Sequence, residues 1–160
     1  MEFAKETVHL VIRDGNQGVY VDKVEGPQTI RMSSRVGSRV PLHCTSVGKV
    51  LLADLTEDKI IELVGTNNLE SYTENTITDL DHLLDELKEV AKKGYAIDNC
   101  EHEKDVRCVA APIKNYNRNV VAAISVSTPA FRFSLDDIAQ MSDKVKEIAF
   151  KISRQLGCIN

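Results

Sequence analysis

No stretch of this 160-residue sequence is apolar over the roughly 20 residues that a transmembrane helix needs. The N-terminus also lacks the basic start and apolar run of a secretory signal. The four cysteines form no CxxC pair and show no regular spacing. These absences predict a soluble, cytoplasmic protein whose cysteines are free thiols.

The sequence has no excess of basic residues, since 20 Lys and Arg face 24 Asp and Glu, for a formal net charge of −4. Affinity for a nucleic-acid backbone needs a basic face, so this chain is a poor candidate for gripping DNA by itself. We find no internal repeat and no low-complexity segment. The 42% of hydrophobic residues is typical of one globular domain with a substantial core.

Strands are predicted near both ends of the sequence. Residues 7–13 and 18–24 are rich in β-branched residues and flank a DGNQG turn, which predicts a β-hairpin. Residues 29–32 predict a short third strand. Three further strands are predicted at 95–99, 107–113 and 120–127, and the turn-rich NYNR segment makes the last two hairpin partners.

Helices are predicted where apolar residues recur at helical spacing. These segments are 46–55, 57–64 after a Thr56 cap, 78–93 with Gly94 at its end, and a long final helix capped by Ser134. Hairpin strands flanking helices imply an α+β fold, an antiparallel sheet with helices packed on one face. We expect loops and a ligand to cover the other face.

Three stretches resemble the ligand-sensing domain of the isocitrate lyase regulator (IclR) family of bacterial transcription regulators, in its order and spacing. They are RVPLHCTSVGKVLLA at 39–53, GYAIDNCE at 94–101 with VRCVAAP at 106–112, and VAAISVS at 121–127 with FRFS at 131–134. The resemblance implies a GAF-like fold, with residues 1–160 forming a single effector-binding domain. The N-terminal winged helix-turn-helix domain of the family is then absent from this chain. Within the family, the sequence is most similar to regulators of sugar-acid use, including the 2-keto-3-deoxygluconate type.

The resemblance also implies a pocket between the sheet and the helix that begins at residue 46. Carried over by motif position, its lining is Ser46, Val47, Asp98, Val106, Cys108, Ser125 and Ser127. Strand geometry independently supports part of this set, because side chains alternate between the two faces of a strand. Ser125 and Ser127 therefore share one face, and so do Val106 and Cys108.

The start of the same helix favours a small anion as the ligand. Its first backbone N–H groups lack helical partners, and the helix dipole adds positive potential. Gly48 lets a ligand approach the backbone closely. We therefore predict a small carboxylate effector, such as a keto acid or sugar acid, with its carboxylate at residues 45–48. Ser125, Ser127 and Asp98 would bond its hydroxyl groups.

Two positions depart from the common family pattern. Asp105 stands where the family usually has glycine, and Cys100 stands where it usually has an acidic residue. An extra carboxylate near the pocket could repel an anion or hold a cation.

Simpler interpretations remain for the same residues. The two serines are compatible with small strand residues bonded to backbone or water, Asp98 with a turn cap, and Cys108 with an inert thiol. No zinc pattern emerges from the spacing of His43, Cys44, Cys100, His102 and Cys108. A catalytic pair of Cys108 and His43 would need a proximity that sequence does not show. We predict no cofactor, no metal and no catalytic residue.

The function predicted from the resemblance is effector sensing and homo-oligomerisation, as a dimer or tetramer. DNA would be contacted only through the missing N-terminal domain, and no membrane is involved. Two alternatives remain: a stand-alone GAF-like ligand-binding module, and a thiol hydrolase. An effector can change the subunit arrangement only by binding one arrangement more tightly than the other.

Overall fold

The chain is described by a computed structural model that covers residues 5–28 and 32–159. Within these residues, six strands form one antiparallel sheet in the order β3-β2-β1-β6-β5-β4. The strands are β1 Thr7–Asp14, β2 Gln17–Val24, β3 Arg39–Pro41, β4 Ala96–Asn99, β5 Val106–Lys114 and β6 Val120–Pro129. The helices are α1 Ser46–Leu52, α2 Glu57–Val64, α3 Leu80–Lys93 and α4 Leu135–Gln155, with a 3₁₀ turn, η1 Ala130–Arg132. The predicted α+β class is confirmed.

The N-terminal strands form the predicted hairpin. β1 and β2 pair around Gly15, whose φ of 62° suits a residue without a side chain. Of the third strand predicted at 29–32, residues 29–31 lie outside the described residues. β3 comes later in the chain, where the sequence analysis predicted no strand, and pairs with β2.

The helix ends follow their capping residues. α3 begins after Asp79, whose side chain accepts the N–H of His82, and ends at Gly94 with a left-handed φ of 74°. Ser134 and Asp137 form a reciprocal capping box at the start of α4. α1 ends at Leu52, three residues earlier than predicted.

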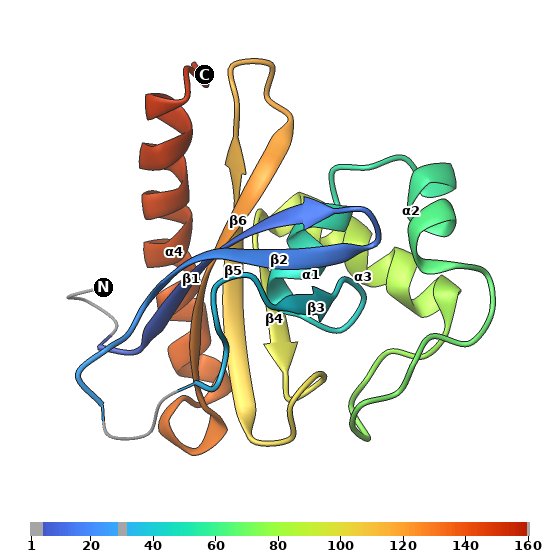
Figure 1. The fold of residues 1–160 in the computed structure, drawn as a ribbon, viewed down its shortest axis with the longest axis horizontal. Helices are drawn as coiled ribbons and strands as arrows, with labels where there is room; N and C mark the ends of the chain where they lie inside the picture. The colour runs from blue at the N-terminus through green and yellow to red at the C-terminus, as the bar shows by residue number, and fades with distance from the viewer. Residues whose placement is uncertain (1–4, 29–31, 160) are drawn as a thin grey trace.

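Helices cover both faces of the sheet, so the expectation of helices on one face is wrong (Figure 1). α4 packs on β5 and β6, with Ile138 and Val145 in one apolar cluster with Val109. α1 packs on the opposite face, backed by α3, in a second cluster that includes Ala110. The reason lies in β5, which is apolar on both sides and therefore needs cover on both.

Across the same described residues, no helix combines the length and the apolar character that a membrane span requires.

Candidate functional site

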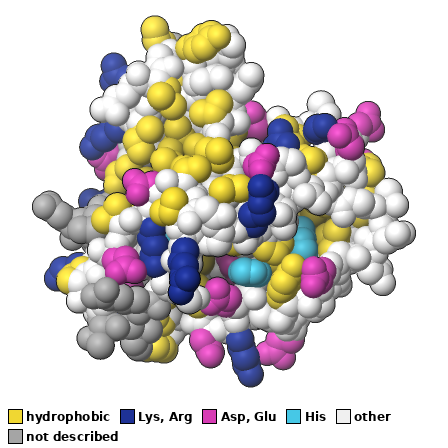
Figure 2. Space-filling model, viewed as in Figure 1, with side chains coloured by type: hydrophobic (Ala, Val, Ile, Leu, Met, Phe, Trp, Pro, Cys, Tyr) yellow, Lys and Arg dark blue, Asp and Glu magenta, His cyan; other side chains and the backbone are white. Residues whose placement is uncertain are grey.

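A hollow lies between the sheet and the start of α1, and charged and histidine side chains surround an opening near the centre of the face in Figure 2. The cavity measures about 30 Å³, which is room for about two water molecules. Of the eight predicted site residues, all but Gly48 line it. The lining residues from that set are Ser46, Val47, Asp98, Val106, Cys108, Ser125 and Ser127.

Strand register explains how residues far apart in the sequence meet here. Asp98 on β4 is the cross-strand partner of Cys108 on β5, and Cys108 is the partner of Ser127 on β6. The three side chains therefore form one row across neighbouring strands. Ser125 lies two residues from Ser127 and faces the same side, as the alternation predicted.

The first hairpin and nearby loops supply lining residues that the sequence analysis missed. They are His9, Tyr20, Met32, Ser34, His102 and Glu103, while Thr45, which lies within the carboxylate site predicted at 45–48, also lines the hollow. His9 pairs with Ser125 across the β1–β6 ladder and is only 2% exposed. Its ring packs against Tyr20, with centroids 4.8 Å apart. A single histidine within the β-branched strand at 7–13 was the available signal, but the pairing of the first strand with the last was not visible.

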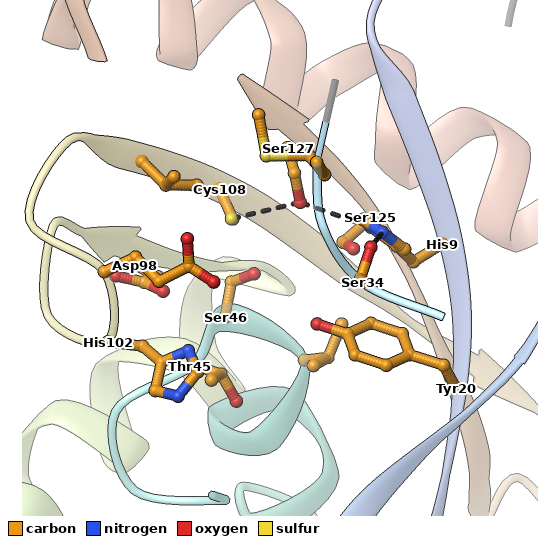
Figure 3. A pocket seen from close by; sticks show the side chains of 14 residues that line it. His9, Tyr20, Ser34, Thr45, Ser46, Asp98, His102, Cys108, Ser125 and Ser127 are labelled. Carbon is orange, nitrogen blue, oxygen red and sulfur yellow. Dashed lines mark hydrogen bonds between the residues drawn. The ribbon is translucent and has the colours of Figure 1, made fainter. Parts of the chain in front are cut away.

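A chain of hydrogen bonds joins these elements inside the hollow (Figure 3). The Cys108 thiol donates to Ser127 Oγ at 3.1 Å, and Ser127 Oγ lies 3.3 Å from His9 Nδ1. On the other side of the ring, His9 Nε2 lies 2.7 Å from Ser34 Oγ. If Ser127 donates to Nδ1, the Nε2–H is left to donate to Ser34, as one tautomer of a neutral ring requires.

Burial keeps two groups of this hydrogen-bonded series, the His9 ring and the Cys108 thiol, uncharged near pH 7. Desolvation, aided by the positive charge of Lys23, lowers the pKa of His9 to about 4. Desolvation also raises the pKa of the Cys108 thiol well above its ordinary value. Because the thiolate is the reactive form, Cys108 is a poor nucleophile in this setting.

The start of α1 brings Ser46 and Val47 to the hollow, whereas Gly48 has another role. Thr45 caps the helix, and its side chain accepts the Gly48 N–H at 3.1 Å. A Cβ built on Gly48 would lie 2.3 Å from the backbone oxygen of Leu42. The close approach that requires glycine here is therefore that of the chain's own backbone, which corrects the role predicted for Gly48.

Asp98 combines the two interpretations that the sequence left open. Its Oδ1 accepts the Glu101 N–H at 2.7 Å and so caps the turn after β4, while the residue also lines the hollow. It is only 3% exposed. Burial raises its pKa to about 7, against the lowering effect of that backbone hydrogen bond.

The catalytic pair considered from the sequence is not formed. Cys108 bonds to Ser127, whereas His43 Nε2 bonds to the Glu70 carbonyl oxygen at 2.9 Å. Within the described part of the chain, no three His, Cys, Asp or Glu side chains gather in a way that could hold a metal ion.

This fold is that of a known class, the C-terminal domain of bacterial regulators. Residues 1–154 match the family described as "Bacterial transcriptional regulator IclR C-terminal". The chain belongs to this family. It is 37% identical over 152 residues to the transcriptional regulator XynR of Escherichia coli, covering 95% of the chain and 60% of XynR. It is 38% identical to the repressor AllR of Salmonella typhimurium, covering 98% of the chain and 58% of AllR. The chain thus spans about 60% of the length of these relatives.

Solved structures agree with this placement. Thermotoga maritima IclR superposes with a TM-score of 0.91 at 44% identity, covering 98% of this chain and 64% of that one. The C-terminal domain of E. coli KdgR gives a TM-score of 0.85 at 35% identity, covering 98% and 90%. The predicted likeness to the 2-keto-3-deoxygluconate type is consistent with this neighbour. A double mutant of the inducer-binding domain of PobR from Acinetobacter, in complex with 3-hydroxybenzoic acid, gives a TM-score of 0.86 at 29% identity, covering 95% and 90%.

Proposed function

We propose that this domain is the effector-sensing part of a transcription regulator and binds a small carboxylate, such as a sugar acid or keto acid, in the hollow. One observation carries the proposal. Seven residues expected from the sequence to form a ligand site converge on a single buried, polar hollow. A buried polar cavity of this kind is where a small polar molecule finds both exclusion from water and oriented hydrogen bonds.

The lining offers partners for both parts of a hydroxylated acid. Ser125 and Ser127 present hydroxyl groups from one strand and are 2% and 6% exposed. Ser46 and Val47 occupy the first turn of α1, where backbone N–H groups lack helical acceptors. The ligand in the PobR structure is itself a hydroxylated carboxylic acid, which supports this class of effector.

A metabolite larger than a few atoms needs more room than the hollow has in this state. The lining of the cavity, which measures about 30 Å³, includes Tyr20 from β2 and Met32 from the segment before β3. We propose that these side chains move when the effector binds. Such movement would link the hollow to the first hairpin.

The remaining parts of the function concern the whole regulator. We propose that DNA is contacted by a domain outside this chain, in the bacterial cytoplasm, and that this domain forms a homo-oligomer. Apolar side chains gather beside α4 on the face seen in Figure 2, which supports a further subunit contact. Effector binding would then act by favouring one arrangement of subunits.

Titration calorimetry against a matched panel tests the ligand class. The carboxylates are gluconate, pyruvate and 3-hydroxybenzoate, and the neutral counterparts are glucose, hydroxyacetone and 3-hydroxybenzamide. We expect at least one carboxylate to bind and its neutral counterpart to bind at least tenfold more weakly, because an anion gains more from unpaired N–H donors. Equal binding of an acid and its neutral counterpart would contradict the proposed class.

A pair of variants tests the location. Ser125→Ala should weaken carboxylate binding about five- to tenfold, the effect of losing one hydrogen bond. Thr128→Ala is the matched control, since Thr128 is a buried hydroxyl residue of the same strand that does not line the hollow. Weakening by the control alone would place the site elsewhere.

A further inference from the structure

Asp98 is a carboxyl group buried in the proposed effector site, and no Lys or Arg among the described residues forms an ion pair with it. It is 3% exposed, and its Oδ1 accepts a backbone N–H from Glu101. The positive charge of Lys49 acts on it and lowers its pKa, though less than burial raises it. An ionised carboxylate in this position is costly unless another charge compensates for it.

Lys49 is already neutralised by other acids. Its side chain is 1% exposed, and its ammonium lies 2.8 Å from Glu101 Oε1 and 3.0 Å from Glu86 Oε1. Glu101 is itself buried, and its Oε2 has no hydrogen-bond partner among the described residues. The charge of Lys49 is therefore balanced by its ion pairs with Glu86 and Glu101, and it compensates the charge of Asp98 less well.

The other described titratable groups that line the hollow add no positive charge near pH 7. Among the described lining residues none is Lys or Arg, and Glu103 adds a second acid. Burial lowers the pKa of both His9 and His102, which favours neutral rings. Burial raises the pKa of the neighbouring phenol and thiol groups, which favours their neutral, protonated forms; these groups belong to Tyr20, Cys44, Cys100 and Cys108.

Lys23 is a further cation near the hollow, and its positive charge contributes to the lowered pKa of His9. Its ammonium donates to the carbonyl oxygens of Met32 and Ser34 and pairs with Glu25 at 3.0 Å. It is therefore also engaged outside the hollow. A carboxylate entering the site would meet Asp98 without any described cation between them.

We infer that Asp98 takes up one proton from solvent when a carboxylate effector enters the hollow, and that its neutral carboxyl group then donates a hydrogen bond to the ligand. Two carboxylates that share a dry site cannot both stay ionised, because their repulsion adds to the desolvation of each. A proton on Asp98 turns the repulsion into an O–H donor facing an anionic acceptor, which is a strong hydrogen bond. Asp98 thereby makes the affinity for an acid depend on pH. This inference rests on the proposed carboxylate class.

The proton belongs on Asp98 rather than on Glu101. Burial raises the pKa of both carboxyl groups, but the Lys49 ammonium lies 2.8 Å from Glu101 and favours its ionised form, whereas the described hydrogen-bond donors to Asp98 are backbone N–H groups. The pKa of Asp98, raised by burial to about 7, also makes proton uptake inexpensive near neutral pH.

Calorimetry in two buffers of different ionisation enthalpy, phosphate and Tris, measures the protons bound per ligand. With whichever of gluconate, pyruvate and 3-hydroxybenzoate binds, we expect an uptake of about 0.9 proton at pH 8, because free Asp98 with its pKa about 7 is then about 90% ionised. The dissociation constant should rise about tenfold from pH 6 to pH 8 as the protonated fraction falls. The acids of the panel stay ionised throughout this range.

Asp98→Asn is the informative variant, because an amide keeps the shape and the donor but cannot titrate. It should bind the same carboxylate with no proton uptake and no pH dependence between 6 and 8. Ser125→Ala should bind more weakly yet keep the uptake. His102→Gln should keep it too, and loss of uptake only in that variant would assign the proton to the imidazole and overturn the inference.

The outcomes separate this inference from the proposed function. Binding of a carboxylate by the wild-type domain without proton uptake would overturn only the inference. Failure of all three acids to bind would overturn both. If Asp98→Asn does not fold, ¹³C NMR of the wild-type carboxyl groups decides, since Asp98 must be protonated at pH 8 with the ligand bound and largely ionised without it.

Discussion

At the scale of single residues, Gly48 shows how one sequence signal can have two physical causes. A glycine at a helix start predicted a ligand close to the backbone. The structure shows the Leu42 backbone in that space, 2.3 Å from where a Cβ would be. Both causes require the absence of a side chain, so the residue type alone could not separate them.

Gly48→Ala should therefore destabilise the fold itself. We expect a loss of about 3 kcal/mol or more in the free energy of unfolding, because the backbone of Leu42 has to shift rather than a flexible side chain. Gly37→Ala is the control, with φ +87° and no atom within 4 Å of the added Cβ, and should cost only about 1 kcal/mol. Urea unfolding measures both. Equal losses would contradict the importance of the contact with Leu42, because Gly48 lies in a helix and has no positive φ that would favour glycine.

At the scale of elements, α4 leaves part of its sheet face uncovered. The helix packs on β5 and reaches β6, while β1 lies beyond it (Figure 1). On this face β1 presents Leu10, half-buried, and Ile12, which is 37% exposed. An apolar sheet face left open beside a helix is the kind of surface that subunit contacts use.

Ile12→Glu should weaken the proposed homo-oligomer, because it places a charge in the uncovered part of this face. We expect sedimentation velocity at micromolar concentration to show oligomer for the wild-type domain and a shift toward monomer for the variant. Val36→Glu, at a residue that is 60% exposed in a loop, should leave the distribution unchanged. A wild-type domain that stays monomeric would contradict the oligomer, and an unchanged Ile12 variant would move the contact elsewhere.

At the scale of the whole molecule, two buried groups of the hollow give stability opposite dependences on pH. Burial raises the pKa of Asp98 from 3.8 to about 7, so the folded state binds more protons between these values and stability falls as pH rises. Burial lowers the pKa of His9 from 6.5 to about 4, so the unfolded state binds more protons and stability falls as pH drops. The raised pKa of Glu101 acts in the same direction as that of Asp98.

Replacing either group should reveal the pH dependence of stability that the other group causes. The free energy of unfolding of His9→Gln should fall as pH rises from 4.5 to 6.5, because Asp98 still titrates. Over the same range the free energy of unfolding of Asp98→Asn should fall less than that of His9→Gln, or should rise, because His9 still titrates. The limit for each group is about 1.4 kcal/mol per pH unit. Urea unfolding at pH 4.5, 5.5 and 6.5 measures the slopes, with the wild-type slope expected between the two. Parallel profiles in the three proteins would contradict this compensation.

The sequence by itself determined the local elements and one side of the site. Periodicity and capping residues such as Asp79 and Ser134 gave the helices, because these signals act within a few residues. Alternation gave the shared face of Ser125 and Ser127, because the period of a strand is fixed.

Tertiary structure alone decided which residues face these two serines. The pairing of β1 with β6 brings His9 to Ser125. The packing of α1 on the sheet encloses Asp98, while Lys49 forms its ion pair with Glu101. Strand order and burial depend on contacts between distant segments, and no local pattern encodes them.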